Sequence, residues 1–153
     1  MPKLDIEALP IDTRTPYPAP FDRAVHGRER RRVGNAAGLN QFGVNLTTRR
    51  PGAASALRHW HASEDELVFV LEGEVVLVED GGETVLKAGD AAGFKANSGN
   101  GHHLLNRTTE DAVYLEIGSR SKHERVEYPD VDLVAVRDDN GWRFTHKNGD
   151  PYG

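Results

Sequence analysis

The sequence contains no cysteine among its 153 residues. A disulfide framework and a thiolate zinc site are therefore excluded, so any metal ion must be held by histidine, carboxylate or backbone oxygen. No apolar run approaches the length of about 18 residues that a membrane-spanning helix needs. The N-terminus also lacks the basic-then-apolar pattern of a secretory signal. We therefore expect a cytoplasmic protein with no membrane partner.

The charge balance and the length exclude further classes. A formal net charge of -5 argues against nucleic acid as a partner. Hydrophobic residues make up 37% and charged residues 28% of the chain, which is typical of a globular protein. No long amphipathic helix pattern and no internal repeat is present. We expect a single domain over residues 1–153.

Short runs of β-forming residues, broken by glycine, aspartate and asparagine, fill the middle of the chain. The expected strands span residues 41–47, 55–61, 66–71, 74–79, 83–87, 102–107 and 112–117. Tight breaks such as Glu72-Gly73 favour hairpins between successive strands. Many short strands at near-regular spacing predict an all-β fold: a sandwich, a barrel or a jelly roll.

The two ends of the chain differ from this pattern. Proline is dense in the first twenty residues, at Pro2, Pro10, Pro16, Pro18 and Pro20. It suits an extended arm over residues 1–30. The arginine-rich run 28–32 could contact an anionic partner, but a solvated turn or a charged edge strand is the plainer interpretation. In the C-terminal extension, 123–153, residues 131–136 predict one more strand. Trp142, Phe144 and Tyr152 are expected to anchor the tail.

Two expected strands are apolar on both faces. In the strand over 66–71, valines alternate with leucine and phenylalanine, and in the strand over 74–79, Val76 and Val78 alternate with Val75 and Leu77. The alternating residues of the first strand are Val68 and Val70 on one face and Leu67, Phe69 and Leu71 on the other. A sheet that faced water on one side would alternate with polar residues instead. We therefore expect a homodimer, with the terminal arms contributing to the cover of the second face.

His59-Trp60-His61, followed by Glu66, is the most informative motif of the chain. Two histidines one residue apart point the same way only on a β-strand, where their Cα atoms lie roughly 6.6–7 Å apart. That separation lets both imidazoles reach one metal ion. A carboxylate from the next strand would complete a two-histidine, one-carboxylate face with open positions for water or substrate.

Two spaced motifs extend this pattern. The first runs Gly52, six residues, His59-x-His61, four residues, Glu66, six residues, Gly73; the second runs Gly89-Asp90, then Gly99-x-x-His102-x-x-x-Asn106. Together they closely resemble the paired motifs of the cupin superfamily over about residues 40–118. The resemblance implies a cupin-type jelly-roll (double-stranded β-helix) barrel. Its core would span about 39–118, with extended N- and C-terminal arms.

The resemblance also implies one divalent metal ion, Zn, Fe, Mn or Ni, with a ligand set of His59, His61, Glu66 and His102. Strand alternation supports the fourth ligand, since His102 shares a face with Leu104 and Asn106. A register slip of one residue would exchange His102 for His103, which stays as an alternative. Glu64 and Asp65 are alternatives to Glu66.

The same residues look like those of small single-domain cupins, some of which are labelled sugar-phosphate isomerases; related domains occur in regulators. This implies a metal-dependent isomerase or epimerase acting on a small polar substrate, with Glu64, His103 or Tyr114 as the base. Lys95, where the family pattern has proline, and the arginines would favour an anionic substrate if they line the barrel mouth. A metal-dependent oxygenase and a non-catalytic small-molecule sensor remain alternatives.

Overall fold

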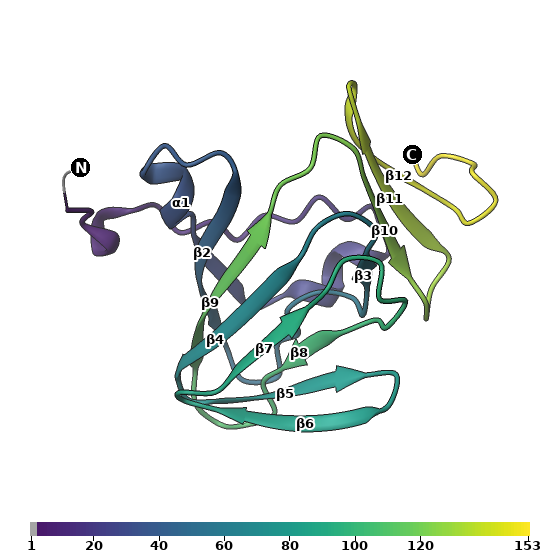
Figure 1. Ribbon diagram of the computed structural model, residues 1–153. Helices are drawn as coiled ribbons and strands as arrows, with labels where there is room; N and C mark the ends of the chain where they lie inside the picture. The colour runs from purple at the N-terminus through teal and green to yellow at the C-terminus, as the bar shows by residue number, and fades with distance from the viewer. Residues whose placement is uncertain (1–2) are drawn as a thin grey trace.

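Two antiparallel sheets face each other across the main apolar core (Figure 1). The computed structural model describes residues 3–153; Met1 and Pro2 of the expected arm lie outside the described residues. The larger sheet comprises, in spatial order, β1 (Arg28–Arg31), β2 (Phe42–Arg49), β9 (Ala112–Ser119), β4 (Glu66–Glu72) and β7 (Ala91–Phe94). The smaller comprises β6 (Gly82–Lys87), β5 (Glu74–Glu79) and β8 (His103–Leu105).

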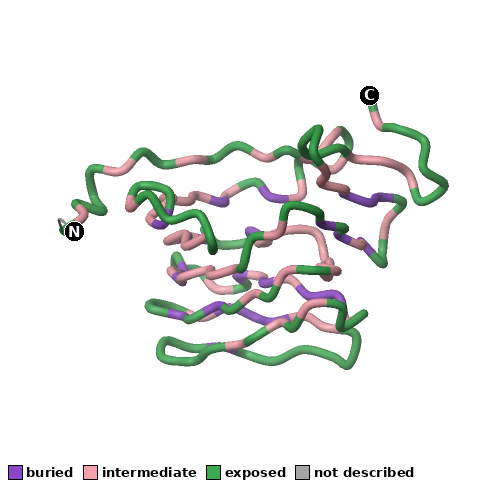
Figure 2. Tube along the Cα trace, turned by 45° about the horizontal axis from the view of Figure 1, so that its top comes forward, coloured by how far each residue is buried: buried purple, intermediate pink, exposed green. Residues whose placement is uncertain are grey.

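The core between these sheets follows from strand alternation. Every second residue of β4 and β9 points inward. Val70 and Tyr114, which lie opposite each other in the strand register, both point into this core. The buried side chains that meet there are Val68, Val70, Val75, Leu77, Leu86, Leu104, Ala112 and Tyr114. Figure 2 shows the buried positions along the strands and the exposed positions in the connecting loops. The expected all-β, cupin-type jelly roll is confirmed.

A third sheet holds the C-terminal extension and part of the N-terminal arm against the barrel. It has the order β12 (Gly141–Thr145), β11 (Leu133–Asp138), β10 (Glu124–Tyr128) and β3 (Trp60–His61). Aromatic residues from both arms pack against it, with ring centroids 6.0 Å apart for Tyr17 and Phe144 and 5.7 Å apart for Phe21 and Tyr152. Phe144 and Tyr152 therefore anchor the tail as expected, whereas Trp142 stays 47% exposed.

The helical segments are short. They are the 3-10 turns η1 (Ile6–Ala8) and η2 (Phe21–Val25) and the one-turn helix α1 (Val33–Ala36). None of the helices within residues 3–153 has the length and apolar character to cross a membrane.

Several expected strand boundaries were wrong. The strand expected over 55–61 is reduced to β3, and residues 55–58 instead form bends. The strand expected over 102–107 covers only β8, from His103 to Leu105. Strands β7, β10 and β12 were missed: β7 reads Ala-Ala-Gly-Phe, and β10 and β12 are rich in polar residues, so none shows a β-forming run.

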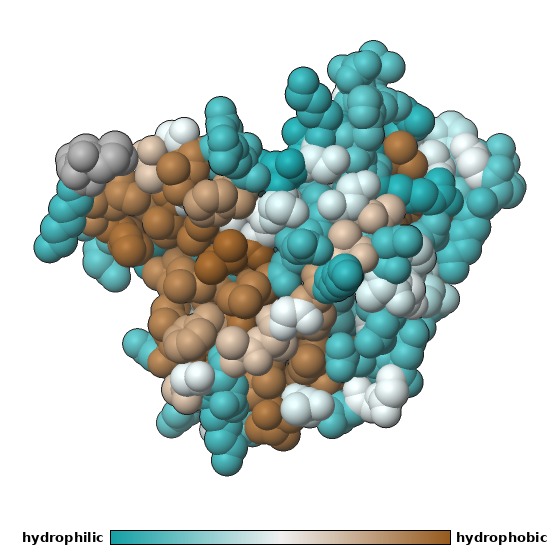
Figure 3. Space-filling model, viewed as in Figure 1, coloured by the Kyte–Doolittle hydropathy of each residue, from teal (hydrophilic) through white to brown (hydrophobic). Residues whose placement is uncertain are grey.

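The outer face of the larger sheet is apolar and open. Leu67, Phe69 and Leu71 of β4 are 37–41% exposed there. Figure 3 shows apolar side chains gathered over β2, β9 and β4. The described arms therefore leave this face uncovered.

Candidate metal centre

Backbone pairing brings the histidine motif and Glu66 to one place. β3 pairs with β10, with His61 opposite Val126. His59 and His102 exchange two backbone hydrogen bonds, of 3.1 and 2.8 Å, so the two motifs lie side by side. Glu66 begins β4, between Phe94 of β7 and Gly118 of β9. The four side chains predicted as ligands therefore meet at one point.

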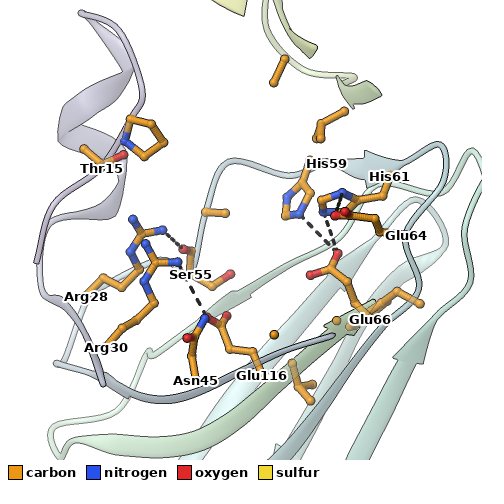
Figure 4. A pocket seen from close by; sticks show the side chains of 18 of the residues that line it. Thr15, Arg28, Arg30, Asn45, Ser55, His59, His61, Glu64, Glu66 and Glu116 are labelled. Atoms are coloured by element: carbon orange, nitrogen blue, oxygen red, sulfur yellow. Dashed lines mark hydrogen bonds and ion pairs between the residues drawn. The ribbon is translucent and has the colours of Figure 1, made fainter. Parts of the chain in front are cut away.

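One carboxylate oxygen lies at the centre of the three imidazoles. Glu66 Oε1 is 2.9 Å from His61 Nε2, 3.4 Å from His102 Nε2 and 3.7 Å from His59 Nε2. Figure 4 shows His59, His61 and Glu66 pointing toward one another. The structure places His102, rather than its alternative His103, in this cluster.

Neighbouring groups fix the orientation of each ring. His59 Nδ1 lies 2.7 Å from the carbonyl oxygen of Leu57. Because a carbonyl only accepts, Nδ1 carries the proton and Nε2 presents its lone pair to the cluster. The ring of His102 stacks on Phe94, with centroids 3.6 Å apart and an interplanar angle of 1°.

His61 faces two further carboxylates. Its Nδ1 is 3.7 Å from Glu124 Oε2 and 3.8 Å from Glu64 Oε1. Burial lowers the pKa of His61, but Glu66, Glu124 and Glu64 outweigh burial and raise it. Burial likewise raises the pKa of Glu66, but the three imidazoles around the carboxylate outweigh burial and hold it well below its usual range. The site is therefore an ionised carboxylate surrounded by nitrogen donors.

This donor set fits a divalent cation. One ligand atom from each of His59, His61 and Glu66 lies within 4.8 Å of the others. Glu66 Oε1 is buried yet makes no well-formed hydrogen bond, as is expected of an atom whose partner is a cation. Imidazole nitrogen with carboxylate oxygen suits Zn, Fe, Mn or Ni. His59, His61, Glu66 and His102 are the residues that would hold the ion.

The three side chains predicted as bases are dispersed. Glu64 lines the cavity beside the cluster, and its Oε2 accepts a 2.8 Å hydrogen bond from the backbone N–H of Ser121. His103 turns away, with Nδ1 2.9 Å from the carbonyl oxygen of Ala56. Tyr114 is fully buried in the core, where its hydroxyl accepts a 2.7 Å hydrogen bond from Arg49. Only Glu64 is thus brought to the cluster.

Glu124 is a site residue that sequence analysis missed. Its side chain is 0% exposed, and Oε1 accepts backbone hydrogen bonds of 2.9 Å from Ser63 and 2.7 Å from Arg125. The other oxygen faces His61 and has no hydrogen-bond partner in the described part of the chain. A carboxylate in this place can accept the ring N–H of a metal-binding histidine and keep the ring oriented. No sequence spacing signals it, because the contact depends on β10 pairing with β3.

The cluster opens into a cavity of about 690 Å³, within the range typical of small-molecule sites. Besides the cluster, its lining includes Tyr17, Arg28 and Arg30 from the N-terminal part of the chain. Arg28 is only 7% exposed, so the expectation that the run 28–32 is solvated was wrong, although β1 is an edge strand as expected. Lys95 is exposed and does not line the cavity.

Comparison with known proteins agrees with this fold. The Cupin domain family matches residues 45–118. A crystal structure from Silicibacter pomeroyi, described as a sugar phosphate isomerase from a cupin superfamily, is 43% identical. The alignment covers 99% of this chain and 97% of that chain, with a TM-score of 0.96. The chain therefore belongs to the cupin superfamily.

Two further structures extend the comparison. One from Acidithiobacillus ferrooxidans, provisionally named a sugar phosphate isomerase, is 30% identical over 79% of this chain and 77% of that chain, with a TM-score of 0.74. The polyketide cyclase RemF from Streptomyces resistomycificus is 17% identical over 91% of this chain and 85% of its own, with a TM-score of 0.65. At that identity it shares the fold alone. A search of the curated proteins finds no match.

Proposed function

We propose that this protein is a metal-dependent isomerase or epimerase of a small sugar phosphate. The observation that carries the proposal is the convergence of three histidines and Glu66 beside a cavity that also contains the carboxylate of Glu64. The 43% identity to a protein described as a sugar phosphate isomerase supports the choice of substrate class.

A divalent ion held by the cluster would polarise a substrate carbonyl and acidify the adjacent C–H bond. Glu64 is the base that we assign to this step. For isomerisation it would remove the proton from that carbon and return it to the neighbouring carbon, while the proton of the substrate hydroxyl passes to the former carbonyl oxygen. For epimerisation it would keep the proton that it removes, and solvent would protonate the opposite face of the same carbon. The backbone N–H of Ser121 holds Oε2, and His61 lies 3.8 Å from Oε1, so the carboxylate keeps a fixed position at the cavity wall.

The test is proton exchange at the substrate. Protein reconstituted separately with Zn, Mn, Ni or Fe(II) is incubated in D₂O with a panel of aldose and ketose phosphates, and deuterium incorporation and product are followed by NMR. We expect metal-dependent interconversion. Glu64→Gln should reduce its rate by about 10²–10⁴-fold, the usual contribution of a general base, while keeping the metal.

The alternatives give different results in the same experiment. A sensor would bind a sugar phosphate with no deuterium incorporation under any of the metals. An oxygenase would consume oxygen only with Fe(II). Either result would replace the isomerase assignment.

We further propose that the apolar face over β2, β9 and β4 is the interface of a homodimer. The face is continuous across neighbouring strands (Figure 3), and Ile6 and Ile11 of the N-terminal arm are also exposed, at 36% and 51%. A contiguous apolar sheet face of this kind is typical of an interface. A second copy of the chain carries the same apolar face and is always present, so it is the partner that we assign to this face.

Charge in the centre of that face should separate the two copies. Light scattering should give twice the chain mass for the native protein, and Phe69→Glu should give a folded monomer, because an unpaired buried charge is strongly unfavourable. Val85, 48% exposed on β6 of the smaller sheet, provides the control: Val85→Glu should remain a dimer. A native protein that is monomeric at micromolar concentration contradicts the interface.

A further inference from the structure

Two arginines in the cavity wall, the buried Arg28 and the half-buried Arg30, have no carboxylate in close contact among the described residues. Arg28 is 7% exposed, and its guanidinium donates to the backbone oxygens of Ser55 and Arg14, at 3.2 and 3.1 Å. Arg30 approaches a carboxylate only loosely, with 3.9 Å between its Nη1 and Glu116 Oε1. Across residues 3–153, no carboxylate oxygen lies within 4.0 Å of the Arg28 guanidinium.

A third guanidinium adds to the positive charge. Arg49 is fully buried behind the wall and donates to the same carbonyl oxygen of Ser55, at 3.2 Å. The Nε atoms of Arg28 and Arg30 and one terminal nitrogen of Arg49 are buried, without hydrogen-bond partners among residues 3–153. Burial, together with the positive charges of Arg30 and Arg49, lowers the pKa of Arg28 to about 10. Such a cluster is unfavourable unless an anion joins it.

The neighbouring Arg14 and Arg32 are in close contact with a carboxylate, which sets Arg28 and Arg30 apart. Arg14 and Arg32 share the carboxylate of Asp12, at 3.0 and 2.9 Å. Figure 4 shows Arg28 and Arg30 on the side of the cavity opposite His59, His61 and Glu66. The cavity therefore has one wall that can hold a cation and a facing wall that can hold an anion.

We infer that Arg28 and Arg30 form the subsite for the phosphate group of the substrate. The identity of the molecule that carries the phosphate rests on the proposed function; the subsite itself rests on the arginines. Guanidinium groups present paired N–H donors that match the oxygens of a phosphate. A phosphate held there leaves the rest of a small sugar directed across the cavity toward the histidine cluster and Glu64, which would position the reacting carbonyl.

Phosphate binding to metal-free protein tests the subsite without catalysis. Inorganic phosphate is titrated into chelator-treated protein and followed by ³¹P NMR and calorimetry. Native protein should bind, and Arg30→Gln should weaken binding about tenfold or more, because a charged hydrogen bond is lost. Arg28→Lys, which keeps the charge but loses the fork of donors, should weaken it as well.

The matched control is Arg107→Gln, which makes the same charge change at an exposed residue paired with Glu83. It should bind phosphate as the native protein does. The variant His61→Ala distinguishes this inference from the proposed function. It should lose the metal but keep phosphate binding. No phosphate binding by native protein, or equal weakening by Arg30→Gln and Arg107→Gln, would overturn the subsite even if isomerase activity were found.

Discussion

Replacing His61 with alanine is expected to abolish stoichiometric metal binding and leave the barrel folded. His61 Nε2 is 2.9 Å from Glu66 Oε1, the shortest of the three imidazole distances, so its loss opens the centre of the site. We expect at least about a 100-fold loss of affinity, since removing a group that merely orients a ligand already weakens metal binding about 10–100-fold. Metal content after reconstitution, measured beside a thermal unfolding curve, checks both parts of the prediction.

The adjacent pair His102 and His103 provides the control. His102 faces Glu66 at 3.4 Å, whereas His103 is held by the carbonyl oxygen of Ala56 and lies outside the cavity lining. His102→Ala should therefore weaken metal binding strongly, and His103→Ala should leave it close to native. The reverse order would contradict the ligand set, and unfolding of His61→Ala at low temperature would make the cluster a structural element instead.

Part of the histidine cluster could be predicted from the spacing of the histidines within each motif. Alternation along a strand places His59 and His61 together, and the same alternation on the next motif separates His102 from His103. The hairpin of β5 and β6 was also predictable, since Asp80-Gly81-Gly82 separates two runs of β-forming residues. The placing of His59 beside His61 and the hairpin depend on residues that are close in the chain, whereas the meeting of His59 with His102 was implied by the resemblance to the cupin motifs.

The anion side of the cavity could not be predicted in this way. Residues 28–32, four arginines and one glutamate, have the composition of a solvated edge strand, and nothing in the run itself distinguishes a solvated strand from a buried one. Arg28 is buried because the arm crosses β1, where Asp12 exchanges backbone hydrogen bonds of 2.8 and 3.0 Å with Arg30. Glu124 was hidden for the same reason, since its contact with His61 comes from strands 63 residues apart in sequence. Long-range pairing, rather than local pattern, decides which charges are buried.

Asn106→Ala is expected to lower the free energy of unfolding by about 2–4 kcal/mol. It leaves several buried polar groups unpaired, and each such group costs about 1–3 kcal/mol. The side chain is 1% exposed, and its Nδ2 donates to the carbonyl oxygens of Arg49 and Glu110, both at 2.8 Å. Its Oδ1 accepts from the N–H and the hydroxyl of Thr108, at 3.0 and 2.7 Å. One amide thus ties the end of β2 to the loop that leads into β9. Urea unfolding followed by circular dichroism measures the loss.

Asn106→Asp distinguishes hydrogen bonding from packing, since the two side chains have the same shape. The substitution turns the Nδ2 donor into an acceptor that faces two carbonyl oxygens, so it should be at least as destabilising as alanine. Asn148 is the exposed counterpart: its amide bonds only to Asp150, at 3.1 and 2.9 Å, and Asn148→Ala should change stability by less than about 0.5 kcal/mol. A free energy of unfolding of Asn106→Asp close to that of the native protein would contradict this account. It would mean that the two carbonyl oxygens find other donors and that the Asn106 amide does not join β2 to the loop before β9.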